Sequence, residues 1–160
     1  MALDHFIAPS VPDAAAVTVR YGAGSGAGNQ LTQAEVGKFC KLVGESRYDN
    51  CAVGNPIEGV VYAVELAPQN GFTIASVLAA SGTRMSVTFD GLQATPGTGA
   101  VAIGDYVVTG TPVAKGTALS AFPKVCTATS QAAAPYMWRV VSLGTAGTGA
   151  VGTTGVIERV

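Results

Sequence analysis

Hydrophobic and polar residues alternate over short stretches of the chain, a pattern that is typical of β-strands. Residues 36–43 (VGKFCKLV) place Cys40 and Leu42 on one face, and Lys38 is a polar misfit on that same face. Residues 57–66 (IEGVVYAVEL) are largely apolar on both faces. This second stretch is therefore expected to be a strand that is covered on both sides.

Turn signals separate the candidate strands at intervals of about ten residues. The dipeptides Asn70-Gly71, Ser81-Gly82 and Asp90-Gly91 bound two of them. Beyond the first two stretches, strands are expected at residues 72–78, 84–89, 106–109, 113–119, 125–128, 136–143 and 155–160. The pattern predicts an all-β fold, a compact antiparallel β-barrel or sandwich (jelly-roll-like) of about 8–10 short strands with an extended N-terminal arm.

The start of the chain differs from the rest and is predicted to lie outside the β domain. Residues 1–21 form a mixed apolar arm, and residues 22–30 (GAGSGAGNQ) form a glycine-rich hinge. Within the arm, residues 14–19 fit either a strand or one short helical turn, since periodicity does not distinguish the two. The arm and hinge together, residues 1–30, thus precede a single β domain, residues 31–160. A disordered terminus is the alternative for the arm.

One heptapeptide occurs twice with a single change. Residues 95–101 are TPGTGAV and residues 145–151 are TAGTGAV, so six of seven positions agree and the copies begin 50 residues apart. Repeat architectures need three or more units, and the flanking residues differ. Two similar glycine-rich hairpin turns are therefore favoured over a duplicated domain, and such segments could become ordered against another subunit.

Charged residues are scarce in this chain. They make up 12% of the sequence, the net charge is −1, and no two lysines or arginines are adjacent. Nucleic-acid binding is not expected, because it needs a cluster of cations. No apolar stretch approaches the roughly 20 residues that span a bilayer, so no membrane partner is expected either. The sparse surface fits a stable β domain of small residues, or a surface that partner chains cover.

Residues able to carry catalysis or bind a metal are few and scattered. His5 is the only histidine, it lies in the arm, and Cys40, Cys51 and Cys126 form no CxxC pair. We therefore predict no catalytic, cofactor-binding or metal-binding residue, and we expect three buried free thiols, as in a protein made in a reducing cytosol. Acidic residues near the N-terminus stand where a signal peptide would carry bases.

Several phrases of the sequence carry a resemblance to a known family. They are VGKFCKLV at residues 36–43, GNPIEGVVYAVE at 54–65, GDYVV at 104–108 and GTPVAKGT at 110–117, followed by a Gly/Thr-rich tail. In strand order and turn phrases, residues 31–160 resemble the head decoration proteins, or capsid cement proteins, of tailed double-stranded DNA bacteriophages. The resemblance includes no catalytic signature.

This resemblance implies a small all-β structural protein without enzymatic activity and without a cofactor. Such a protein binds the outer surface of the expanded phage capsid, bridges neighbouring major capsid protein subunits, and associates with itself as a homotrimer or homodimer. The resemblance also implies a place in the virion for a chain made in the bacterial host cytoplasm. A protein that binds the expanded lattice better than the unexpanded one stabilises the expanded lattice by mass action.

On this hypothesis the arm is a strap that lies on a neighbouring subunit and adds a strand to an exposed sheet edge. The candidate capsid or partner contacts are its apolar side chains, Phe6, Ile7, Val11, Val17, Val19 and Tyr21. Two alternatives stay open. A host-surface or carbohydrate-binding β module of a phage tail fibre or adhesin would need exposed aromatic residues, and a small β-barrel hydrolase would need acids that converge in a cleft.

Overall fold

The computed structural model describes four parts of the chain, residues 16–21, 32–44, 47–69 and 72–160. They form eleven strands and two 3-10 turns, η2 (Gln33–Glu35) and η3 (Gln131–Ala133). The first sheet contains β1 (Ala16–Tyr21), β2 (Phe39–Gly44), β3 (Arg47–Asn50), β4 (Gly59–Gln69) and β5 (Phe72–Leu78). The second contains β6 (Arg84–Leu92), β7 (Thr95–Pro96), β8 (Val107–Thr109), β9 (Lys124–Thr127), β10 (Trp138–Ser142) and β11 (Thr154–Arg159).

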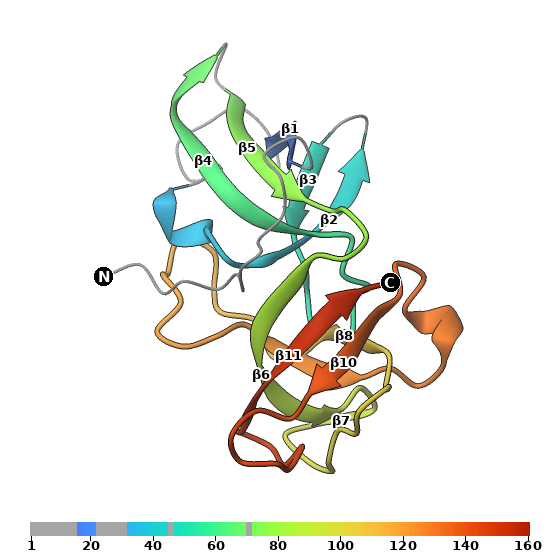
Figure 1. Ribbon diagram of the computed structural model, residues 1–160. Helices are drawn as coiled ribbons and strands as arrows, with labels where there is room; N and C mark the ends of the chain where they lie inside the picture. Colours follow the sequence, from blue (N-terminus) through green and yellow to red (C-terminus); the bar gives the residue numbers. More distant parts are fainter. Residues whose placement is uncertain (1–15, 22–31, 45–46, 70–71) are drawn as a thin grey trace.

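The first five strands close into a small barrel in the order β1-β3-β2-β4-β5. β5 pairs antiparallel with β4 on one side and with β1 on the other, so β1 completes the ring. β1 runs parallel to β3, with Tyr21 opposite Tyr48. The barrel makes up the upper half of the molecule in Figure 1. Closure lets neighbouring strands satisfy backbone groups that an open sheet edge would leave unpaired.

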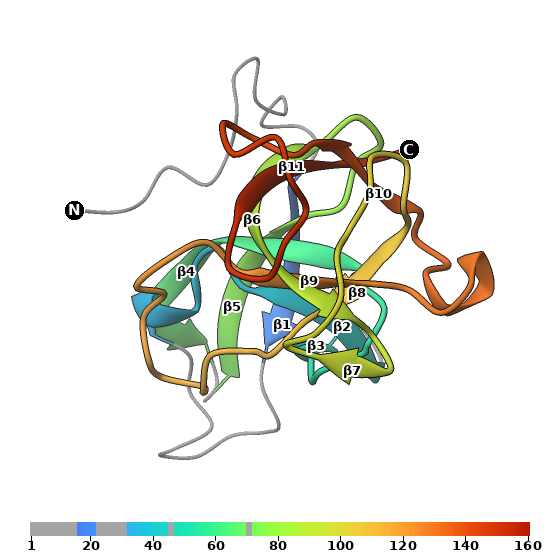
Figure 2. The same ribbon diagram turned by 90° about the horizontal axis from the view of Figure 1, so that it is seen from below.

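The second sheet has the order β10-β11-β6-β9-β8, and β7 pairs with the end of β6. Its two outer strands are linked by the segment that leads into β8. An isolated bridge joins Tyr106 to Arg139, the Gly104 amide donates to the Val140 carbonyl at 2.8 Å, and the Val140 amide donates to the Asp105 carbonyl at 2.9 Å. The curved arrangement is visible when the molecule is seen from below (Figure 2).

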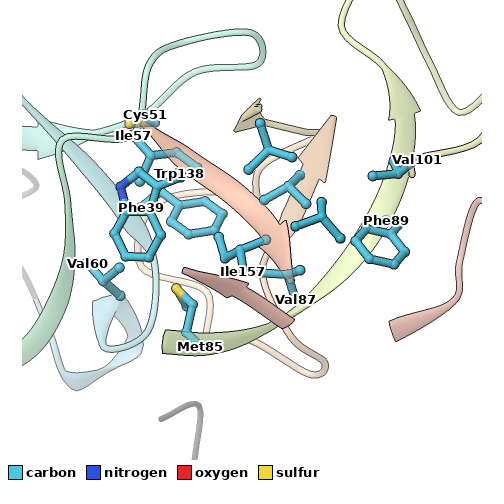
Figure 3. Close-up of a cluster of buried hydrophobic side chains, with 13 residues drawn as sticks. Phe39, Cys51, Ile57, Val60, Met85, Val87, Phe89, Val101, Trp138 and Ile157 are labelled. Atoms are coloured by element: carbon cyan, nitrogen blue, oxygen red, sulfur yellow. The ribbon is translucent and has the colours of Figure 1, made fainter. Parts of the chain in front are cut away.

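The barrel and the second sheet share one hydrophobic core. Phe39 and Val60 reach it from the barrel, and Cys51 and Ile57 reach it from the connection between β3 and β4. The second sheet contributes the remaining members of the cluster, Met85, Val87, Phe89, Val101, Val107, Val125, Trp138, Val140 and Ile157. Figure 3 shows the side chains of this cluster gathered between the strands of the two halves. Because apolar burial is the main driving force of folding, this shared core holds the two halves together.

β1 belongs to the barrel because its alternate residues fit the barrel interior. Val19 and Tyr21 are buried in a second cluster with Cys40, Val61, Val64, Ala75 and Val77, whereas Thr18 is exposed. The structure thus resolves the choice between strand and helical turn in favour of a strand. Residues 16–21 belong to the predicted arm, yet as β1 they form part of the barrel. The predicted hinge, residues 22–30, lies outside the described residues.

The prediction of an all-β fold is confirmed, including the strands expected at residues 57–66, 72–78 and 84–89, which correspond to β4, β5 and β6. Pairing is mainly antiparallel, but β1 runs parallel to β3 and β6 runs parallel to β9. Alternation within one strand does not report the direction of its neighbour, so the sequence pattern could not distinguish these parallel pairs.

Two local predictions are wrong. Residues 113–119 form no strand and instead lie in a loop, residues 111–123, in which Gly116 adopts a positive φ of 79° that suits glycine. Asp90-Gly91 does not end a strand, because β6 continues through both residues and pairs with β7 beyond them. Contacts with distant segments override the local strand preference in the loop, whereas β6 extends past Asp90-Gly91 by pairing with β7 just after it.

Candidate functional site

A buried ion pair lies at the side of the barrel, where η2 leads into β2. Glu35 is fully buried and accepts a hydrogen bond from the Lys38 ammonium, with 3.0 Å between Nζ and Oε2. The hydroxyl of Thr32 caps η2 by accepting from the Ala34 amide, and this turn brings the two side chains together. Lys38 lies just before β2 and not in a strand, and its charge is matched inside the protein.

The ion pair continues into a polar network that includes β1 and β3. The side-chain amide of Asn50 donates through Nδ2 to Glu35 Oε2 at 2.6 Å, and the Tyr21 hydroxyl donates to Asn50 Oδ1 at 2.6 Å. Burial, followed by the influence of neighbouring Cys40 and Asp49, raises the pKa of Tyr21 above its usual range. Tyr21 thus stays a neutral donor, and the network fixes β1 against β3.

The same network holds the long loop of residues 111–123 against the barrel. The Lys38 ammonium donates to the Ala114 carbonyl at 2.9 Å, and the Gly116 amide donates to Glu35 Oε1. Between these two contacts, the Lys115 ammonium pairs with Asp49 Oδ1 at 2.8 Å. Three successive residues of the loop are thus fixed to one side of the barrel, and Figure 1 shows the loop, in orange, reaching up to η2.

Asp90 fixes the two ends of this loop. Its Oδ2 accepts from the Thr111 amide at 2.7 Å, and its Oδ1 lies 3.3 Å from the Lys124 ammonium. Burial acts to raise the pKa of Asp90, but the hydrogen bonds from Thr111 and the charge of Lys124 outweigh it, so the pKa is lowered. Asp90 therefore stays ionised and bound to both ends of the loop at neutral pH.

A cavity of about 120 Å³ lies beneath the loop, between the barrel and the second sheet. Its inner wall includes the buried residues Phe39, Cys51 and Thr109, and its rim includes the exposed residues Pro112 and Ala121. The other lining residues are Lys38, Asn50, Thr111, Val113, Leu119, Ser120, Phe122, Pro123 and Lys124. The lining is mostly apolar, as in small-molecule sites of other proteins.

The cysteine in the cavity wall, Cys51, is not an activated nucleophile. Burial raises the pKa of the Cys51 thiol to about 11, although the neighbouring Thr109 hydroxyl acts in the opposite direction. The thiol donates weakly to the Pro56 carbonyl, with 3.5 Å between sulfur and oxygen. A thiol with this pKa is almost entirely protonated at neutral pH, and the protonated form is a poor nucleophile.

The three cysteines are all buried and free, as predicted from the sequence. Burial also raises the pKa values of Cys40 and of Cys126, the latter to about 11. Within the described ranges no three His, Cys, Asp or Glu side chains come close enough together to hold a metal ion. His5 lies outside those ranges.

The two copies of the heptapeptide lie side by side on the surface of the second sheet. Ala100 and Ala150, which occupy the same position in their copies, form an antiparallel bridge, and the Val101 amide donates to the Gly149 carbonyl at 2.9 Å. The first copy also pairs with the end of β6 through Thr98. The prediction of two glycine-rich turns is extended by this finding, because the turns pair with each other.

We call residues 92–104 and 144–152 the paired-repeat surface. No Asp, Glu, Lys or Arg occurs at any of these positions. Ile103 is 65% exposed, and Leu92 and Val151 are each 40% exposed, so large apolar side chains face solvent here. The nearest carboxylate is that of Asp105, which accepts from the Ala102 amide at 2.9 Å. Such surfaces on folded proteins commonly mark contacts with other proteins.

The residues predicted to contact a partner are placed in three different ways. Val19 and Tyr21 are buried in the barrel of their own chain, so they are not available to a neighbour. Val17 is 57% exposed at the start of β1. The remaining three, Phe6, Ile7 and Val11, lie outside the described residues, and their contact with a partner stays a prediction.

Sequence reasoning missed the polar network. It predicted that the heptapeptide segments could become ordered against another subunit, but not that the two copies pair with each other. Lys38, polar at an apolar position of an alternating stretch, was the signal for the network, but its partner Glu35 lies outside that stretch. The absence of charge across residues 91–104 and 140–157 was the signal for the surface.

Comparison of the chain with protein families, with curated proteins and with solved structures finds no match. Among the described residues, no helix has the length and apolar character needed to cross a membrane.

Proposed function

We propose that this chain is a structural virion protein that binds the outer surface of the expanded phage capsid. In this role it stabilises the shell by bridging neighbouring major capsid protein subunits, and it associates with itself as a homotrimer or homodimer. It is made in the bacterial host cytoplasm and acts without catalysis. The proposal rests on the sequence resemblance described above, together with one observation on the molecule.

That observation is the paired-repeat surface. Ile103, Leu92 and Val151 expose apolar side chains where no charged group lies in the same segments. Covering these side chains removes apolar area from water at a gain of about 25 cal/mol per Å². A partner that covers these side chains therefore gains binding free energy.

The fixed loop and the shared core suit a bridging role. A bridge between two subunits resists their separation only if the bridge itself keeps its shape. Glu35 and Asp90 fix the loop of residues 111–123 at its middle and at its ends, and the core of Figure 3 joins the barrel to the second sheet. Identical weak contacts repeated over a symmetric shell then add up to firm attachment.

Co-sedimentation with expanded and unexpanded capsids of the cognate phage tests the proposal. We expect saturable binding to expanded capsids, at a fixed ratio to the major capsid protein, and a marked loss of binding to unexpanded ones. Equal binding to both forms, or none to either, would contradict it. Binding to host-surface glycans in the absence of capsid would instead support the adhesin alternative.

A further inference from the structure

Three side chains that can react with one another meet in the polar network beside the barrel. One carboxylate oxygen, Glu35 Oε2, accepts from the Lys38 ammonium at 3.0 Å and from Asn50 Nδ2 at 2.6 Å. The amine nitrogen and the amide nitrogen therefore lie against the same oxygen atom. Lys38 comes just before β2 and Asn50 ends β3, so the antiparallel pairing of these two strands keeps the two groups close.

The side-chain amide of Asn50 is oriented for attack on its carbonyl carbon. A carboxylate only accepts hydrogen bonds, so Nδ2 must face Glu35 and Oδ1 must face away from it. Oδ1 accepts from the Tyr21 hydroxyl at 2.6 Å. Such a donor stabilises the negative charge that develops on the oxygen when a nucleophile attacks the carbon atom, Cγ.

We propose that Lys38 and Asn50 become joined by an intramolecular isopeptide bond between Lys38 Nζ and Asn50 Cγ. Glu35, which touches both reacting groups, carries the protons, and Tyr21 stabilises the oxyanion. The reaction occurs once in each molecule and modifies the chain itself. It does not depend on binding to a capsid, so the isolated protein is sufficient to test it.

The reaction balances without an outside reagent. Glu35 takes a proton from the Lys38 ammonium, and the neutral amine attacks Asn50 Cγ to form the Nζ–Cγ bond. The Cγ–Nδ2 bond then breaks, and its electron pair stays on Nδ2. Nζ gives up a second proton through Glu35, and one of the two protons passes to Nδ2, which leaves as ammonia. The products are a secondary amide, ammonia and the neutral carboxylic acid of Glu35.

The burial of the ion pair favours this reaction. Glu35 is fully buried and Lys38 is 5% exposed, so both charges lie where desolvation makes them costly. The same surroundings favour transfer of the proton from the ammonium to the carboxylate, because both partners then become neutral. The products carry no charge, so the reaction removes the cost of the buried pair.

The cavity beneath the loop of residues 111–123 gives the ammonia a way out. Lys38 and Asn50 both line this cavity, and its rim includes the exposed residues Pro112 and Ala121. Its volume of about 120 Å³ exceeds the roughly 30 Å³ that one water molecule occupies in the liquid. A molecule of the size of ammonia can therefore pass from Asn50 to solvent.

Mass spectrometry of the folded, full-length protein tests the proposal directly. We expect the intact mass to be lower than the sequence mass by one ammonia molecule. Trypsin does not cleave after an acylated lysine, so a digest should contain residues 21–41, uncut at Lys38, linked to residues 48–84. A complete sequence mass would overturn the proposal, and so would a loss of ammonia without this linked peptide.

Four variants test the roles of the residues. Lys38→Arg keeps the positive charge but removes the amine, so it should keep the complete sequence mass. Glu35→Gln should slow formation of the bond at least about a hundredfold, because an amide cannot carry the protons. Tyr21→Phe should slow it about a hundredfold through loss of the oxyanion donor. The matched control is Lys115→Arg, which changes the exposed neighbouring pair with Asp49 and should form the bond like wild type.

The rates are measured by intact mass at successive times after cell-free synthesis of each full-length chain. Circular dichroism identifies the variants that fold, and only those are compared. A linked peptide in Lys38→Arg, or a wild-type rate in Glu35→Gln, would overturn the proposal. Should every network variant fail to fold, the wild-type mass and its tryptic peptides still decide whether the bond forms.

Discussion

At the scale of single residues, Glu35 and Lys38 determine how the barrel holds the loop of residues 111–123. A fully buried carboxylate is costly unless every charge and hydrogen bond is matched. Here Lys38, Asn50 and Gly116 all donate to it. The pair is thus more a device for placing the loop of residues 111–123 than a source of net stability.

Removing Lys38 tests this view. Lys38→Met leaves the Glu35 carboxylate buried without its counter-charge, so we expect the free energy of unfolding to fall by about 3–5 kcal/mol. The matched control is Arg84→Met, which breaks the Arg84–Glu158 pair, in which the arginine side chain is 55% exposed. That change should cost no more than about 0.5 kcal/mol. Urea denaturation of both variants measures the difference, and equal losses would show that the buried pair has no special role.

Asp90 gives the molecule an acid-sensitive contact. Its pKa is lowered in the folded protein, so it binds protons more weakly there than in the unfolded chain, where an aspartate titrates near 3.9. Its stabilising contribution is complete above about pH 5 and is lost as the pH falls through the folded-state value. Asp90→Asn should therefore flatten the fall in stability between about pH 5 and pH 2.

Urea midpoints measured across that range test the prediction. Glu158→Gln is the control, because it removes one negative charge from an exposed pair on the second sheet. If stability falls equally steeply with decreasing pH in the wild type and in Asp90→Asn, other carboxylates determine the loss of stability in acid.

At the scale of elements, pairing between distant segments decides what the local pattern leaves open. Apolar patterning is sufficient to predict β4, β5 and β6. The expected cover on both faces of β4 holds for Val60 and Val61, which are buried, but not for Tyr62, which is 46% exposed. The pattern is not sufficient for residues 113–119, which alternate weakly but lie in the loop held by Glu35 and Lys38. The prediction fails there because side chains about 80 residues away supply the hydrogen bonds that a strand neighbour would otherwise supply.

The candidate site was less predictable than the fold. Val19 and Tyr21 look like free apolar residues of an arm when only the first 30 residues are considered. Their burial depends on β5 and β3, which lie on either side of β1 in the ring. The paired-repeat surface depends in the same way on a bridge between Ala100 and Ala150, and the identity of the two heptapeptides indicates similar turns but not their contact.

Two glycines of the second heptapeptide test that contact. A Cβ on Gly149 would collide with the Val101 carbonyl oxygen. A Cβ on Gly147 would meet nothing within 4 Å, so a substitution there is disfavoured only by the positive φ of 63°. Gly149→Ala should lower the free energy of unfolding by about 3 kcal/mol, and Gly147→Ala by about 1 kcal/mol. Chemical denaturation distinguishes them, and equal costs would mean that the two copies separate easily.

At the scale of the whole molecule, the part of the proposed strap that precedes β1 can be deleted without removing a strand of the barrel. Deleting residues 1–15 removes Phe6, Ile7 and Val11 but keeps β1. We expect reduced capsid occupancy with an unchanged free energy of unfolding. Deleting residues 1–28 would also remove β1 and open the barrel, so that variant serves as the destabilised reference. Undiminished occupancy of the shorter deletion would show that the strap is not needed.

The account depends most on the paired-repeat surface as the face that meets the capsid. Ile103→Lys combined with Val151→Lys places two charges on that surface, and Leu42→Lys places one at a similarly exposed apolar position of the barrel, where the wild-type side chain is 48% exposed. Quantitative co-sedimentation with expanded capsids, at matched stability, measures each variant. We expect the double variant to bind at least about tenfold more weakly, because buried unpaired charges are costly, and Leu42→Lys to bind like wild type. Wild-type binding by the double variant, or an equal loss in both, would contradict the account.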